Sequence, residues 1–442
     1  MTTRQKPENR IWNPACECMP RPALEALQLE RLQAIVKVAW EKVGYYRAKM
    51  EAAGVRPEDI RALVDAALLP FTTKDDLRAC FPYQAFATPL EDVVRIHASS
   101  GTTGQATVVG YTRQDLDTWS ELMARLHTAA GMTRSDIVQI AFGYGFFTGG
   151  IGHHYGVEKV GAAVLPVSSG KSERQIQIMK DYGSTVLICT PSYGMYLAEL
   201  IEATGSRPDI KLRLGLFGGE AWTDAMRQAL ERGLGVFATD NYGLSEVLGP
   251  GVSCECVEQH GMHLAEDHFL PELIDPATGR VVTAAAGGGE LVLTTLTKQG
   301  IPVIRYRTRD LCTFYEGDCP CGRTGRRMSK VSARSDDMLI IRGVNVYPQQ
   351  IEEALLSVEG VTPNYQIVAS RKGALDDLEV LVEVHESLFF DEMTKQQSIK
   401  QAIERRIEVA VGLHVNVRLV EPGSTPRSEG KAVRVIDRRP RS

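Results

Sequence analysis

Apolar and polar positions repeat with two different periods along the chain. Between residues 21 and 50 apolar side chains recur at a spacing close to 3.6, which predicts a helix. From about residue 137, short apolar runs alternate with helical stretches. The predicted strands are 137–141, 163–167, 186–189, 212–218 and 236–240, and the predicted helices between them are 172–181, 194–203 and 224–234. This alternation is typical of a doubly wound α/β sheet.

The pattern changes twice toward the C-terminus. Strands are predicted at 273–274, 290–295 and 301–307, which indicates a β subdomain. Strands at 338–342, 366–369, 379–384 and 416–419, with helices at 348–358 and 396–411, predict a compact α+β unit. We therefore expect an α/β protein with a large N-terminal domain (residues 1–335), which combines the doubly wound sheet and the β subdomain. A hinge would join it to a small α+β C-terminal domain (residues 336–442).

Composition narrows the class of protein. The 442 residues are 43% hydrophobic and 24% charged, as in ordinary globular proteins. The net charge of −5 argues against nucleic-acid binding, which favours a basic excess. The sequence contains no apolar run near the roughly 18 residues of a membrane span, and its start lacks the apolar region of a secretory signal. We expect a cytoplasmic protein with neither nucleic acid nor membrane as a partner.

A short segment between two extended stretches is rich in hydroxyls and glycine. Residues 99–104 read Ser-Ser-Gly-Thr-Thr-Gly. Glycine lets backbone N–H groups approach a phosphate closely, and hydroxyls donate further hydrogen bonds. The segment is not a Walker A loop, because Gln105 stands where that motif has lysine. Taken alone, the segment is equally compatible with a solvated turn.

Three further segments carry candidate chemistry. Residues 218–220 and 240–246 follow successive predicted strands, and ligands of open α/β sheets bind at such strand ends. Their glycines, tyrosine and carboxylates suit a nucleotide base and Mg²⁺. Residues 305–310 hold three arginines and a carboxylate, which suit ribose and phosphate, although a surface ion-pair network is the alternative. Residues 143–149 lack the Rossmann spacing, which argues against a dehydrogenase, and their aromatic rings suit an apolar pocket.

These segments also occur in a recognisable order. The motifs SSGTTG, GGE, YGLSE, YRTRDL, SDDMLIIRGVNVYPQQIEE and SEGKAVRV follow one another along the chain. The order and the residues of these motifs resemble those of the adenylate-forming (acyl-CoA ligase) superfamily, and within it those of the phenylacetate–CoA ligases. The resemblance extends over nearly the whole length of the chain. The resemblance implies that an aryl carboxylate attacks Mg-ATP to give an acyl-adenylate and pyrophosphate. The thiol of CoA then displaces AMP. It also implies a homodimer.

The resemblance further implies roles for individual residues. Those of the nucleotide site are Ser99, Ser100, Gly101, Thr102, Thr103, Gly104, Gly219, Glu220, Asp240, Asn241, Tyr242, Gly243, Asp310 and Arg334. Within this set, residues 99–104 hold the β- and γ-phosphates, Gly219, Glu220 and Tyr242 contact adenine, and Asp310 binds the ribose hydroxyls. The candidates for the acid pocket are Tyr144, Phe147 and Gly149.

The remaining roles concern catalysis and movement. Glu246 would bind Mg²⁺, and Lys431 would bridge the carboxylate and the α-phosphate. Asp336 would be the hinge, and Gly343 would lie in the loop that turns toward the thioester tunnel.

The sequence departs from the pattern at two positions, because Gln105 replaces the usual loop lysine and Ala333 a usual glycine. Neither carries an assigned chemical role. The sequence leaves open which aryl acid is used (phenylacetate, hydroxyphenylacetate, indoleacetate or benzoate) and whether the acceptor is CoA. A nucleotide-binding module without catalysis is disfavoured by the presence of Glu246, Asp310 and Lys431.

The cysteines suggest a structural zinc site. Cys319 and Cys321 flank a proline in a turn of the kind found in zinc knuckles. Relatives that carry Cys-Pro-Cys-Gly pair it with Glu-Cys, six residues and His, and this pattern fits Cys256 and His263. We therefore expect zinc on Cys256, His263, Cys319 and Cys321, with Cys254 and His260 as alternative ligands. Four reduced thiols beside a surface histidine are the alternative to a metal site.

Overall fold

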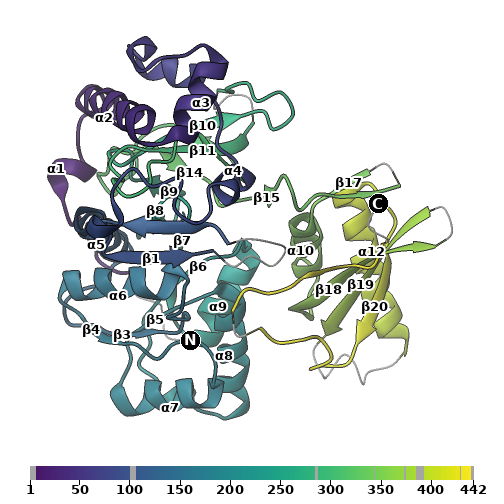
Figure 1. Ribbon diagram of the computed structural model, residues 1–442. Coiled ribbons are helices and arrows are strands. Elements are labelled where there is room, and N and C mark those ends of the chain that lie inside the picture. Colours follow the sequence, from purple (N-terminus) through teal and green to yellow (C-terminus); the bar gives the residue numbers. More distant parts are fainter. Residues whose placement is uncertain are drawn as a thin grey trace. The chain divides into compact units, whose positions relative to one another are not determined.

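A computed structural model describes residues 6–99, 106–283, 287–342, 344–372, 375–384, 393–428 and 430–439. The chain divides into two compact units (Figure 1). The first comprises residues 1–189, 210–219 and 237–330, and the second residues 190–209, 220–236 and 331–442. Within the described ranges, no helix is long and apolar enough to cross a membrane.

The N-terminal helical pattern forms two helices rather than the single one predicted. After the short α1 (Pro14–Glu17), α2 (Arg21–Lys42) and α3 (Gly44–Ala53) are separated by Val43, whose backbone is extended (φ −118°, ψ 104°). The break lets both helices bury apolar faces in one cluster, which includes Val36 and Met50. A periodic pattern does not show such a break, because the apolar spacing continues across it.

A nine-stranded sheet organises the first unit. Its strands, in spatial order, are β13 (Phe314–Tyr315), β14 (Arg327–Met328), β9 (Met262–Leu264), β8 (Gly249–Glu255), β7 (Phe237–Leu244), β6 (Leu214–Gly218), β5 (Val186–Cys189), β3 (Ile137–Ile140) and β4 (Ala163–Leu165). The neighbouring strands from β7 to β4 are parallel, which confirms the predicted α/β pattern. The strands from β7 to β13 pair antiparallel, and this half was not predicted.

One of the helices near the nine-stranded sheet was predicted from the sequence, and two others were not. The predicted helix is α7 (Ser172–Tyr182). Helices α5 (Arg113–Ala129) and α6 (Thr148–Val160) were not predicted, and they pack side by side against β8 (Figure 1). Thr112 caps α5, since Asp115 N donates to its Oγ1 at 3.1 Å and Thr112 N donates back to the carboxylate at 2.9 Å. The short α4 spans Lys74–Ala79.

A smaller antiparallel sheet holds β10 (Phe269–Ile274), β11 (Gly289–Thr295) and β12 (Tyr306–Cys312). The predicted strand 301–307 is therefore wrong over most of its length. Arg305 has a left-handed φ of 46°. Its guanidinium binds both carboxylate oxygens of Glu272 at 3.0 Å and the carbonyl of Leu69 at 2.8 Å. This local network interrupts the extended backbone before β12 begins.

The second unit contains the predicted C-terminal α+β elements. The predicted elements are β16 (Leu339–Ile341), α10 (Pro348–Leu356), β18 (Val361–Lys372), β19 (Leu375–Val384), α12 (Met393–Val411) and β20 (Asn416–Val420). The strands β15 (Ala333–Arg334), β17 (Val344–Val346) and β21 (Val435–Asp437) were not predicted. Strands β20, β19, β18 and β21 form one sheet in that order. Ile341, Leu355, Ile367 and Ile403 are fully buried in its core. The unit also includes α8 (Pro191–Ala203) and α9 (Asp224–Leu234).

Candidate functional site

The hydroxyl-rich segment connects two paired strands, as predicted. β1 (Arg95–Ala98) and β2 (Val108–Tyr111) are antiparallel. Ser99 N donates to the carbonyl of Thr107 at 2.9 Å, which continues the ladder by one residue. The other predicted phosphate-binding residues, Ser100, Gly101, Thr102, Thr103 and Gly104, lie outside the described residues, as does Gln105.

The candidate segment 240–246 begins within a strand, although it was predicted to follow one. Asp240, Asn241, Tyr242 and Gly243 belong to β7, which extends to Leu244. The strand continues because it pairs with β6 on one side and β8 on the other. Gly243 is required by close packing, since a Cβ there would lie 2.1 Å from the carbonyl oxygen of Gly249.

Two predicted nucleotide ligands from different sheets meet in the structure. The hydroxyl of Tyr242 donates to the Asp310 carboxylate at 2.6 Å. Burial, together with the adjacent carboxylate, raises the pKa of Tyr242 well above its ordinary value. Asn241 donates from its side chain to the carbonyl of Phe217 at 2.8 Å, which fixes it against β6. The sequence thus predicted residues that are far apart in the chain and adjacent in space.

Glu246 lies just beyond β7 with two lysines nearby. Its side chain is 7% exposed, and Oε1 is 3.3 Å from the Nζ atom of Lys74, the first residue of α4. The Nζ atom of Lys298 is 3.5 Å from the backbone carbonyl of Glu246. Burial lowers the pKa of Lys298 to about 8, although the carboxylates of Asp115 and Glu246 oppose the shift. Neither lysine belongs to a motif, so neither was predicted from the sequence.

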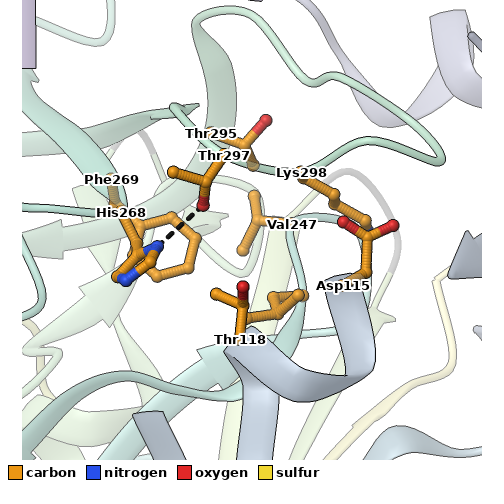
Figure 2. A pocket seen from close by; sticks show the side chains of 9 residues that line it. Asp115, Thr118, Val247, His268, Phe269, Thr295, Thr297 and Lys298 are labelled. Atoms are coloured by element: carbon orange, nitrogen blue, oxygen red, sulfur yellow. Dashed lines mark hydrogen bonds between the residues drawn. The ribbon is translucent and has the colours of Figure 1, made fainter. Parts of the chain in front are cut away.

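Lys298 also lines a small pocket with Asp115, Thr118, Val247 and residues of the adjacent sheet (Figure 2). On the opposite wall His268 Nδ1 and Thr297 Oγ1 are 2.7 Å apart. Lys298 lies 4.9 Å from the centre of the Tyr111 ring, and the Tyr111 hydroxyl donates to the carbonyl of Leu248 at 2.6 Å. These contacts hold the turn that carries Glu246 from more than one side.

The aromatic candidates for an acid pocket lie around the start of α6. The Tyr144 hydroxyl and His154 Nδ1 are 3.2 Å apart. Phe147 is the N-cap of α6 and is 51% exposed, while Gly149 lies in the first turn of that helix. Phe146 accepts at its backbone carbonyl from Ala98 N at 3.2 Å, which places this aromatic segment beside β1.

Several predicted residues belong to the second unit. Arg334 forms two 3.0 Å hydrogen bonds with the carboxylate of Asp336, so the expected nucleotide ligand and the expected hinge residue form an ion pair. Oε2 of Glu220 accepts from the backbone N–H of Ala432 at 2.8 Å, next to Lys431. Gly219, with φ of +84°, lies at the end of the first unit's segment 210–219, and Gly343 lies outside the described residues.

The four residues expected to bind zinc form a buried cluster. One ligand atom each from Cys256, His263, Cys319 and Cys321 lies within 4.8 Å of the others. Cys256 Sγ and Cys319 Sγ are 3.7 Å apart, and Cys321 Sγ is 3.3 Å from His263 Nε2. The alternative ligand His260 instead faces Arg327, with 2.9 Å between its Nδ1 and the guanidinium.

The electrostatics of this cluster favour thiolate. A hydrogen bond with Cys256 holds the pKa of the Cys321 thiol well below its ordinary value, and His263 lowers it further. The same hydrogen bond and burial raise the pKa of Cys256. Burial would lower the pKa of His263, but hydrogen bonds with Cys319 and Cys321 raise it. These shifts favour a Cys321 thiolate beside a protonated His263 in the metal-free cluster, and zinc, which binds thiolate and neutral imidazole, would displace the histidine proton.

Comparison with known proteins identifies the family. The AMP-binding enzyme model matches residues 22–296, and the AMP-binding enzyme C-terminal domain model matches residues 343–439. The chain is 50% identical to phenylacetate-coenzyme A ligase of Escherichia coli (strain K12) over 421 residues, covering 94% of this chain and 95% of the relative. It is 47% identical to the enzyme of that name from Thermus thermophilus over 444 residues, with 97% and 100% covered.

A solved structure gives the same result for the fold. A 2-hydroxyisobutyryl-CoA ligase, crystallised in the postadenylation state in complex with R3-HIB-AMP, matches with a TM-score of 0.91 at 30% identity. The match covers 97% of this chain and 93% of that one. The chain belongs to the phenylacetate–CoA ligase family of the adenylate-forming enzymes.

Proposed function

We propose that this protein is an ATP-dependent ligase that joins phenylacetate to CoA through an acyl-adenylate. The observation that carries the proposal is the identity of 47–50% to curated phenylacetate–CoA ligases over nearly the full chain. The contact between Tyr242 and Asp310 supports it, because two motifs expected at one nucleotide site lie within 2.6 Å.

The chemistry proceeds in two displacements. A carboxylate oxygen of the acid attacks the α-phosphorus of ATP, the bond to the β-phosphate breaks, and pyrophosphate leaves. The thiolate of CoA then attacks the acyl carbon, the acyl–oxygen bond breaks, and AMP leaves with the former carboxylate oxygen. In this proposal Lys431 holds the carboxylate against the α-phosphate, which lowers the entropic cost of the first displacement. Tyr242 and Asp310 position the nucleotide, as do the other nucleotide-site residues named from the sequence.

Mg²⁺ is expected to accompany ATP, and Glu246 fits as its ligand. The Glu246 carboxylate is only 7% exposed and lies beside the ammonium of Lys74. A positive charge is therefore favoured next to this carboxylate. When bound, Mg²⁺ neutralises charge on the phosphates of ATP. Residues 99–104 would supply the backbone N–H and hydroxyl donors for the outer phosphates.

The domain boundary, the hinge and the thioester loop stay part of the proposal. Residues 336–442 would turn about Asp336 between the two half-reactions, which would bring either Lys431 or the loop of Gly343 to the acyl group. The Arg334–Asp336 ion pair supports a switch at this point, because both side chains are 41–52% exposed and such pairs are weak.

The aryl acid is tested by a substrate panel. Tyr144, Phe147 and Gly149 are proposed to contact the acid. The aromatic segment that precedes α6 lies next to β1, as the hydrogen bond from Ala98 N to the carbonyl of Phe146 shows. Pyrophosphate exchange into ATP is measured with phenylacetate, hydroxyphenylacetate, indoleacetate, benzoate and a fatty acid. We expect phenylacetate among the better substrates. Exchange with the fatty acid and with no aryl acid would refute the assignment.

A structural zinc ion is proposed at the cysteine–histidine cluster. Tetrahedral zinc with Zn–S bonds near 2.3 Å places sulfur atoms about 3.8 Å apart, and the Cys256–Cys319 separation is 3.7 Å. His263 Nδ1, opposite the cluster-facing nitrogen, is buried without a partner in the described structure. Four protein ligands leave no position for substrate, so the ion would stabilise the fold and take no part in the ligation.

Assembly and location remain predictions of the sequence. We propose a homodimer, which light scattering of the purified protein would test, and a cytoplasmic location, which fractionation of cells would test.

A further inference from the structure

Lys431 is bracketed by two hydrogen bonds to its chain neighbours. The hydroxyl of Thr190 donates to the carbonyl of Gly430 at 2.9 Å. On the other side, the backbone N–H of Ala432 donates to Oε2 of Glu220 at 2.8 Å. The backbone of Lys431 is therefore tied down immediately before and immediately after the residue.

Both anchors are themselves fixed at the start of α8. Thr190 is the N-cap of this helix and accepts from Tyr193 N at 3.3 Å. The second carboxylate oxygen of Glu220 accepts from Ser192 N at 2.7 Å, in the first helical turn. Because each oxygen of Glu220 accepts a backbone N–H, the carboxylate links α8 directly to the Lys431 segment.

The segment also has an internal brace. The hydroxyl of Ser428 donates to the carbonyl of Lys431 at 2.8 Å and accepts from Gly430 N at 3.2 Å. Farther along, a guanidinium nitrogen of Arg434 lies 3.4 Å from Ser192 Oγ. Lysine has a long flexible side chain. A fixed backbone reduces its conformational freedom, so the ammonium spends more time where it can contact the substrate.

We propose that Thr190 and Glu220 are positioning residues that hold Lys431 for the adenylation half-reaction. The inference rests on the proposed function of Lys431. It differs from the adenine contact that the resemblance implies for Glu220, because it assigns the carboxylate to the backbone of the lysine segment. The two anchors should matter when Lys431 acts and should be dispensable once the acyl-adenylate exists.

The test compares the two half-reactions in Thr190→Val and Glu220→Gln. Valine keeps the shape of threonine without its hydroxyl, and glutamine keeps only one of the two acceptor oxygens. We expect kcat for phenylacetate-dependent pyrophosphate exchange to fall about tenfold in each variant, the loss of one hydrogen bond from the transition state. KM for ATP should stay within about twofold in Thr190→Val, and Thr190→Ser, which retains the hydroxyl, should restore the exchange rate.

Two controls separate positioning from folding. In Thr190→Val, the rate of thioester formation from supplied phenylacetyl-adenylate and CoA should stay near the wild-type value, which also shows that this variant folds. Thr223→Val removes the equivalent N-cap of α9, where Thr223 accepts from Met226 N at 3.2 Å, and should not slow exchange.

Three results would overturn the inference: a higher KM for ATP with unchanged kcat, equal losses in both half-reactions, or an equal loss in Thr223→Val. If the wild-type protein shows no acid-dependent exchange, the proposed function itself fails, which is a separate outcome.

Discussion

The ammonium of Lys74 lies 3.3 Å from Oε1 of Glu246, and the lysine is 42% exposed while the carboxylate is 7% exposed. Because this carboxylate is almost fully buried, loss of the ammonium would leave a buried charge without its cation, so the contact contributes to stability. We propose that Lys74 also supplies positive charge to the phosphates of ATP, because Gln105 stands in the sequence where the family usually has a loop lysine.

Lys74→Met should therefore raise KM for ATP about three- to tenfold in the exchange assay, since one charged contact to phosphate is lost. The melting temperature should fall as well, because the largely buried carboxylate of Glu246 loses its cation. Lys37→Met is the matched control. Lys37 forms an exposed ion pair with Glu41, with 4.0 Å between the two charged groups, and neither residue belongs to a motif. A fall in melting temperature with unchanged KM would assign Lys74 a structural role instead.

The zinc proposal predicts both a metal content and a stability effect. Protein purified without chelator should contain about one zinc per chain by elemental analysis. Cys319→Ser should lower the melting temperature more than Cys254→Ser, since Cys319 belongs to the cluster and Cys254 does not. KM for ATP should not change in either variant. Metal-free wild-type protein, with equal melting temperatures for both variants, would contradict the proposal.

Lys431→Ala should separate the half-reactions more strongly than either anchor variant. Removing the ammonium should nearly abolish pyrophosphate exchange, because the negative carboxylate then meets the α-phosphate without compensation. Thioester formation from supplied phenylacetyl-adenylate should continue at a rate close to that of the wild type. Equal losses in both assays would count against alternation of the C-terminal segment between two positions.

Buried histidines predict a loss of stability in mild acid. His127 Nε2 and His153 Nδ1 are 2.9 Å apart with both rings buried. Burial lowers the pKa of His127 to about 3 and that of His153 well below its ordinary value. Below about pH 6.5 the unfolded chain binds protons at these residues that the folded chain does not, so stability is full above that pH and falls as pH decreases.

The slope is measurable by urea unfolding between pH 7 and pH 4. Each histidine should contribute up to about 1.4 kcal/mol of unfolding free energy per pH unit. His153→Gln should reduce the slope by about one proton, whatever its effect on stability at pH 7. A variant with the same slope as the wild type would show that His153 is not neutral in the folded protein.

The sequence predicted the elements whose pattern is local. Strands β5 and β20 and helix α9 were predicted within a residue, because apolar runs, caps and turn glycines all occur in the segment itself. The four residues of the cysteine–histidine cluster, and Tyr242 and Asp310 as separate nucleotide-site residues, were predicted from motifs that lie up to 68 residues apart in the chain. The contact between Tyr242 and Asp310 was not predicted. Periodicity alone contains no such information.

The misses have physical causes. Helix α6 reads Thr-Gly-Gly-Ile-Gly at its start, and these glycines disfavour a helix in isolation. Close packing of α6 against α5 requires one of them, since a Cβ on Gly152 would lie 2.5 Å from Cζ2 of Trp119. Lys74 and the Thr190–Gly430 contact depend on how distant segments meet, which a single sequence does not reveal.

Oxygen-18 transfer tests the central claim most directly. Phenylacetate labelled in both carboxylate oxygens is converted with ATP and CoA, and the AMP, pyrophosphate and thioester are analysed by mass spectrometry. The acyl-adenylate route predicts one labelled oxygen in AMP, one in the thioester carbonyl and none in pyrophosphate. Formation of the thioester with unlabelled AMP, or with ADP and labelled phosphate, would contradict it.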